Sequence, residues 1–193
     1  RGVSLDPCIT SAARDSFRIA LPRPGDVCLP DGIDMRKKLD VYLSRLGPAF
    51  EYEELDLSGS ENRVVGIARL KAAFEDGIDV VLTAEGPVDV FGYDETILRS
   101  FSGSVGASLT RNGGKYLIKA ANMARASALT VPTDEPASTI LVCARPGARG
   151  ARIAFEIATI LESALPPAPL FKRYFLDQEK WNEHQAFDAE EVK

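Results

Sequence analysis

The stretch Gly77-Ile-Asp-Val-Val-Leu-Thr-Ala84 decides the fold class of this 193-residue chain. A helical pattern runs directly into it and ends at Asp76-Gly77, and the residues that follow are apolar in a nearly continuous run. Strands covered by helices on both faces read as short apolar runs of this kind, and they are typical of parallel sheets. The stretch therefore predicts a buried strand over 78–84, entered straight from a helix.

Strand and helix patterns alternate on both sides of this run. We expect further strands at 17–21, 50–57 and 139–144, and helices between them with apolar residues at helical spacing. The first helix has its apolar residues at Met35, Leu39, Tyr42, Leu43 and Leu46, and either Asp31 or Asp34 caps it. The second presents Val64, Ile67, Leu70, Ala73 and Phe74. Further helices are expected at 94–101, at 115–128 and from the 145–150 turn to about residue 165.

This order of elements is that of repeated strand–helix–strand units. Such units are nearly always right-handed and place helices over a parallel sheet. We predict an α/β fold: a three-layer α/β/α domain over residues 17–167 with a mostly parallel sheet. An N-terminal arm (1–16) precedes it, and an arm rich in aromatic and charged residues (168–193) follows a proline run.

Composition excludes several classes of function. The net charge of −5 argues against nucleic-acid binding through a basic face, and no apolar run approaches the roughly 20 residues that span a bilayer. Three cysteines without a C-x-x-C pair, and a single histidine at His184, argue against zinc and against a histidine-based triad.

Cysteine usage also indicates an intracellular, reducing compartment. Because the chain begins at Arg1, either it was trimmed or a leader was removed. We expect the cytoplasm or, after cleavage of a leader, the mitochondrial matrix.

Ligands of open α/β sheets bind beyond the carboxyl ends of the strands. Loops after Leu21, Ala84 and Ala144 meet that description. The third, Arg145-Pro-Gly-Ala-Arg-Gly150, combines glycines with positive charge at the start of a helix, where free N–H groups favour an anion. It is either an anion site or a solvated turn that carries arginines.

The loop after Ala84 holds several carboxylates. Asp89, Asp94 and Glu95 could together hold Mg²⁺, which prefers oxygen ligands. Alternatively, Asp94 is only the N-cap of the short helix that follows it. Asp94 is accordingly the candidate catalytic and metal-binding residue, and the residues leave open whether the domain is an enzyme at all.

Two stretches resemble the molybdopterin-binding domain of molybdenum-cofactor biosynthesis proteins. In GIDVVLTAEGP…DVFGYDET (77–96), Thr83, Gly86, Asp94 and Thr96 fall at or near the places of that family's Thr-Thr-Gly-Gly-Thr-Gly loop and its Asp-x-Thr. ILVCARPGARGARIAFEIATILESALPP (140–167) resembles the family's closing strand, Pro-Gly loop and helix.

The resemblance implies a domain that binds a phosphorylated pterin or a similar anion. Molybdopterin would then contact Gly86 and Thr96 from one loop and Arg145, Gly147 and Arg149 from the other, with Mg²⁺ at Asp94. The chain departs from the family's motif at Glu85, which breaks the double glycine. A carboxylate in a loop that cradles a phosphate would repel it.

A second hypothesis follows from that degraded motif. The chain is then a non-catalytic subunit of a large assembly, organellar in one version, that has kept an enzyme-like fold. The C-terminal arm would dock on a protein partner, because aromatic residues are enriched at interfaces; alternatively, its aromatic residues pack back on their own domain. The anchors would be Phe171, Tyr174, Phe175 and Trp181.

Overall fold

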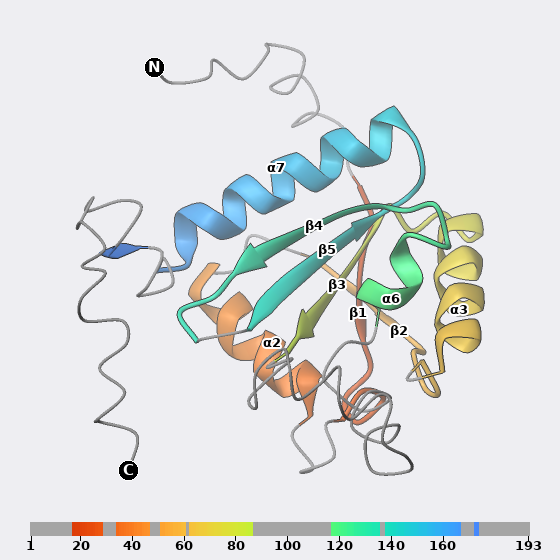
Figure 1. Ribbon diagram of the computed structural model, residues 1–193, viewed down its shortest axis with the longest axis horizontal. Coiled ribbons are helices and arrows are strands. Elements are labelled where there is room, and N and C mark those ends of the chain that lie inside the picture. Colours follow the sequence, from red (N-terminus) through yellow and green to blue (C-terminus); the bar gives the residue numbers. More distant parts are fainter. Residues whose placement is uncertain are drawn as a thin grey trace, which may run out of the picture.

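The computed structural model of the protein describes residues 17–28, 34–46, 51–60, 62–86, 117–135, 138–166 and 172–173. Figure 1 shows a central sheet with helices packed around it. In chain order the elements are β1 (Ile19–Pro22), α2 (Met35–Leu43), the 3₁₀ turn η2 (Ser44–Leu46), β2 (Glu53–Leu55), α3 (Arg63–Glu75), β3 (Val80–Glu85), α6 (Ile118–Ala121), β4 (Ser127–Pro132), β5 (Thr139–Ala144) and α7 (Ala148–Ala164).

The five strands form one mixed sheet in the order β2-β1-β3-β5-β4. Strand β1 pairs in parallel with both β2 and β3, whereas β5 pairs antiparallel with both β3 and β4. The α/β class is therefore confirmed, but the expectation of a mostly parallel sheet is wrong. All four predicted strands are present, and β5 runs in the direction opposite to the one expected.

Strand β4 is the reason for this difference. A helix was predicted over 115–128, but in the described part of that range the helix covers only Ile118–Ala121. Arg125 then takes a left-handed conformation at φ 59°, and the chain leaves in extended form as β4. Thr133 donates its N–H to the Ser138 carbonyl at 3.1 Å, which continues the ladder beyond Pro132 and Thr139 as β4 turns back into β5. The hairpin makes β5 antiparallel to β4, and because β4 runs in the same direction as β3, β5 is antiparallel to β3 as well.

Helices lie on both faces of the sheet. Every residue of β1, β3 and all but the first of β5 is buried, which requires cover on each side. Right-handed crossovers from β1 out to β2 and back to β3 place α2 and α3 on opposite faces. The turn η2 that ends α2 contacts α7, and α6 contacts α3, so each face carries a pair of helices.

Local sequence explains where the helices begin. The Asp34 side chain accepts the Arg36 N–H at 2.9 Å and caps α2, and Asn62 caps α3 by accepting the Val64 N–H at 2.9 Å.

One predicted core position is wrong, because Val64 is 72% exposed and Gly66 faces the core instead. In the described part of the chain, no helix is both long enough and apolar enough to cross a bilayer.

Candidate functional site

The register of the sheet decides which of the predicted loops can meet. Because β1 and β3 are parallel, Pro22 and Glu85 lie at the same end of the strands. Because β5 is antiparallel to β3, Ala144 pairs with Val80 at the opposite end. Five residues of about 3.3 Å each separate the two ends, or roughly 17 Å. The loop after Leu21 and the loop after Ala84 therefore lie at one end of the sheet, and the loop after Ala144 lies at the other.

The predicted pterin contacts are divided by this geometry. Gly86 is buried directly after β3, with φ 89°. The other three predicted contacts follow β5 and lie at the opposite end of the strands: Arg145, Gly147 and Arg149. The expectation that Gly86 and the Arg145 loop meet around one ligand is therefore wrong.

The arginines of the second loop contact a buried carboxylate of the same chain. Asp79, only 5% exposed, has one carboxylate oxygen 3.3 Å from Arg145 Nη1 and 3.8 Å from Arg149 Nε. Its other oxygen accepts the backbone N–H of Arg18 at 3.1 Å. The positive charge that suggested an anion site thus already has an internal counter-ion.

The glycines of the same loop are explained by the turn. Gly147 adopts φ 96°, a left-handed conformation that favours glycine. A Cβ on Gly150 would lie 1.7 Å from the Arg145 carbonyl oxygen, because the first turn of α7 packs against the preceding loop. Both glycines are needed for the fold whether or not a ligand binds, and the interpretation as a solvated, arginine-bearing turn accounts for them.

Glu85 is the second internal carboxylate. It is 2% exposed, and its Oε1 accepts the Thr83 hydroxyl at 3.1 Å and the Leu117 and Ile118 N–H groups at 2.9 and 3.4 Å. Its negative charge therefore lies at the start of α6, against backbone donors that an external anion would need. Burial, together with the charge of Glu85, raises the pKa of Cys143 to about 12.

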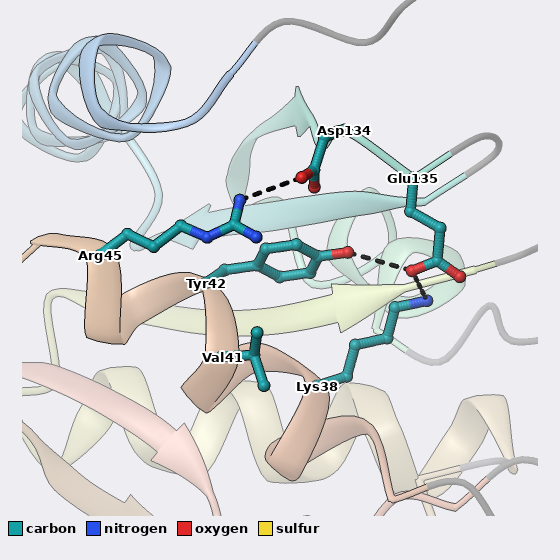
Figure 2. A pocket seen from close by; sticks show the side chains of 6 residues that line it. All are labelled: Lys38, Val41, Tyr42, Arg45, Asp134 and Glu135. Atoms are coloured by element: carbon teal, nitrogen blue, oxygen red, sulfur yellow. Dashed lines mark hydrogen bonds and ion pairs between the residues drawn. The ribbon is translucent and has the colours of Figure 1, made fainter.

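A third polar cluster lines an open groove of about 470 Å³ between α2, η2 and the β4–β5 turn (Figure 2). Lys38 Nζ lies 2.7 Å from Glu135, and Arg45 lies 3.1 Å from Asp134. The Tyr42 hydroxyl donates to the same Glu135 carboxylate at 3.1 Å, and burial raises the pKa of Tyr42. Each cation in the groove faces a carboxylate, so this arrangement fastens the hairpin turn to α2.

Several predicted residues lie outside the described residues. These are the catalytic and metal candidate Asp94 with Thr96, Asp89 and Glu95, the helix at 94–101, and the four aromatic anchors of the C-terminal arm. Among the residues that the structure does describe, no group of three His, Cys, Asp or Glu side chains could hold a metal ion.

Sequence reasoning missed the part played by Asp79. Asp79 belongs to the apolar run 78–84 in the sequence, but in the structure it precedes β3, and it is the only charged residue of that run. An acidic residue inside a buried segment is a signal of a partnered charge, because such groups are seldom buried unpaired. That signal, set beside the arginines after β5, would have favoured an ion pair over an anion site.

No family model, no curated protein and no solved structure matches the chain.

Proposed function

We propose that this chain is a non-catalytic subunit of a larger protein assembly, built on an enzyme-like α/β fold. One observation carries the proposal: the chain's own carboxylates face the donors that the sequence offered to an anion. Asp79 pairs with Arg145 and Arg149, and Glu85 accepts the N–H groups at the start of α6. A phosphorylated ligand would have to displace a buried carboxylate at either place.

The C-terminal arm supplies the contact with a protein partner in this proposal. Phe171, Tyr174, Phe175 and Trp181 would be its anchors, because large aromatic side chains dominate the binding energy of interfaces. A three-layer α/β/α arrangement, supported by helices on both faces of the sheet, would present the arm on a stable scaffold.

Native size in an extract of the source tests this proposal. The full chain should migrate with a complex much larger than its own 20.9 kDa, and a chain truncated after Pro169 should not. The isolated truncated domain should keep the melting temperature of the full chain. If the arm packs on its own domain instead, its removal should lower stability by several kcal/mol. Assembly that survives truncation would contradict the docking role.

Binding of a phosphorylated pterin or a similar anion is the second candidate function, and Gly86 favours it. This buried glycine has φ 89° and follows β3, which lies beside β1 and runs parallel to it. Ligands of open α/β sheets bind beyond the carboxyl ends of such strands. The site would be confined to this end of the strands, with Thr96 and a Mg²⁺ ion at Asp94 as its further parts.

Calorimetry separates the two candidates. Molybdopterin, or its adenylylated form, is titrated into about 100 µM protein, and no heat is expected if the chain is a structural subunit. The absence of heat would exclude a dissociation constant below about 100 µM, which corresponds to a binding free energy of about 5.5 kcal/mol. Saturable heat that is lost in Asp94→Asn but kept in Asp76→Asn, a change at an exposed acidic residue at the end of α3, would support the pterin site instead.

A further inference from the structure

The outer edge of β4 is the feature of the sheet that the proposed function leaves unused. Strand β4 is the last strand of the order β2-β1-β3-β5-β4, and it pairs with β5 over six consecutive residues without a bulge. Within the described ranges, no strand pairs with its other side. Figure 1 shows β4 at the margin of the sheet, beneath α7.

The ladder defines which backbone groups of β4 face outward. Thr133 donates its N–H to Ser138, so the groups of residue 133 point toward β5. Groups of successive residues alternate along an antiparallel strand, so those of Leu129 and Val131 also point toward β5. The Arg145 N–H donates to the Asp79 carbonyl, which fixes the same alternation from the β3 side.

Ala128, Thr130 and Pro132 consequently direct their backbone groups away from the sheet, and all three are exposed. Pro132 has no N–H to leave unpaired, as expected at an edge position. The outer edge therefore offers the N–H and C=O of Ala128 and of Thr130, and pairing stops at Pro132.

Charge distinguishes β4 from the opposite edge strand. Strand β2 spans three residues and carries Glu53 and Glu54, which are 49% and 55% exposed. Charged residues and short length are devices that keep an edge from pairing with another copy. Strand β4 is twice as long and has no charged residue. Two β2 edges would set carboxylates against each other, and two β4 edges would not.

We propose that β4 pairs antiparallel with β4 of a second copy of this chain, around a two-fold axis through Leu129. In this register Ala128 faces Thr130 of the other copy on each side of the axis. Each of these pairs exchanges two N–H···O bonds, so the four outward N–H groups meet the four outward C=O groups. The two five-stranded sheets become one continuous ten-stranded sheet. This inference rests on the fold and does not depend on the proposed function.

Side chains at the axis are compatible with this pairing. Leu129 is only partly buried and packs beside the core, so two copies of Leu129 would cover each other as a directly opposed pair. On the other face, Ala128 and Thr130 are small and uncharged. A closed, self-complementary interface of this kind is the commonest form of homodimer.

Thr130→Pro tests the proposal, with Thr130→Val as its matched control. Proline removes only an N–H that points away from β5, so the intramolecular ladder stays intact, and valine keeps the N–H at nearly the same volume. We expect light scattering to give about twice 20.9 kDa for the wild type and Thr130→Val at about 100 µM. Thr130→Pro should weaken the dimer at least about tenfold. A wild type that stays at 20.9 kDa at this concentration, or a dimer unaffected by proline, would overturn the proposal.

Cross-linking at the axis supplies an answer even if the proline variant fails to fold. Leu129→Cys, in a chain that also carries Cys8→Ser and Cys28→Ser, should form a disulfide-linked dimer under mild oxidation, because directly opposed residues bring their Cα atoms within disulfide range. Val64→Cys is the control, at a position 72% exposed on α3. Cross-linking at Leu129→Cys no faster than at Val64→Cys would contradict a β4–β4 interface.

Discussion

Replacing Asp79 should weaken the connection between the sheet and the Arg145 loop. The Asp79 carboxylate accepts the Arg18 N–H and faces two arginines across a buried edge of the sheet. Asp79→Ala leaves that N–H without its acceptor and the two guanidinium groups without their counter-ion. Asp79→Asn keeps an oxygen for the N–H and removes only the charge.

The magnitude follows from the exposure of each partner. A hydrogen bond to a charged group contributes about 1.5 to 3 kcal/mol. The arginine side chains are 38% and 49% exposed and can turn to water, so each ion pair contributes less than about 1 kcal/mol. We therefore expect Asp79→Ala to lower the free energy of unfolding by about 3 kcal/mol and Asp79→Asn by about 1 kcal/mol.

Urea denaturation followed by far-UV circular dichroism measures both variants. Asp76→Asn is the matched control, because Asp76 is an exposed acidic residue at the end of α3 and hydrogen-bonds Arg18 through its backbone carbonyl, which the variant keeps. The control should change stability by less than about 0.5 kcal/mol. The reasoning is refuted if Asp79→Ala costs no more than Asp76→Asn, since Asp79 would then be no counter-ion.

Three further changes test other parts of the structure. Gly150→Ala should lower the free energy of unfolding by about 1 to 3 kcal/mol, because its Cβ would overlap a backbone carbonyl. Gly66→Ala, whose Cβ would have its nearest contact at 3.3 Å, should lower it by less than about 1 kcal/mol. Equal urea midpoints for the two variants would contradict this difference. Glu85→Ala should cost about 3 kcal/mol and Glu85→Gln less, because the amide still accepts one hydrogen bond; thermal denaturation measures both, and an unchanged alanine variant would contradict the buried network. Cys143 should resist a thiol reagent in the native state while exposed Cys28 reacts, as peptide mapping would show. Because burial raises the Cys143 pKa from 9.0 to about 12, its contribution to stability is complete below pH 9 and is lost as the pH rises toward 12; a Cys143→Ala chain with the same alkaline stability loss would contradict this.

Sequence patterns predicted the elements well wherever the chemistry is local. Apolar runs located β1, β3 and β5, and helical spacing located α2, α3 and α7. Asp34, one of the two candidates for the cap, caps α2, because its side chain needs only the next two residues to do so. Residues close together in the sequence determine these features, so the sequence is sufficient to predict them.

Strand direction could not be predicted in the same way. The run 139–144 is equally apolar whether β5 runs parallel or antiparallel, and its direction depends on β4. Ala121 and Ala124 continue a helical pattern, but Arg125 ends the helix by taking a left-handed conformation. Such a conformation is uncommon for a residue other than glycine, so the sequence did not predict that the helix ends there. Because β4 was not predicted, the direction of β5 was predicted wrongly. The same error placed Arg145, Gly147 and Arg149 at the wrong end of the strands.

The antiparallel pairing of β3 with β5 is the central claim, because it separates Gly86 from the arginines after β5. Nuclear Overhauser contacts between backbone protons test it directly. Leu82 and Val142 form a directly opposed pair without mutual hydrogen bonds, as do Ala84 and Ile140, so their α-protons should be in close contact. We predict strong α-proton to α-proton contacts for both pairs. Their absence, together with contacts between Val80 and Ile140 at matching strand ends, would show a parallel β5 and contradict the account.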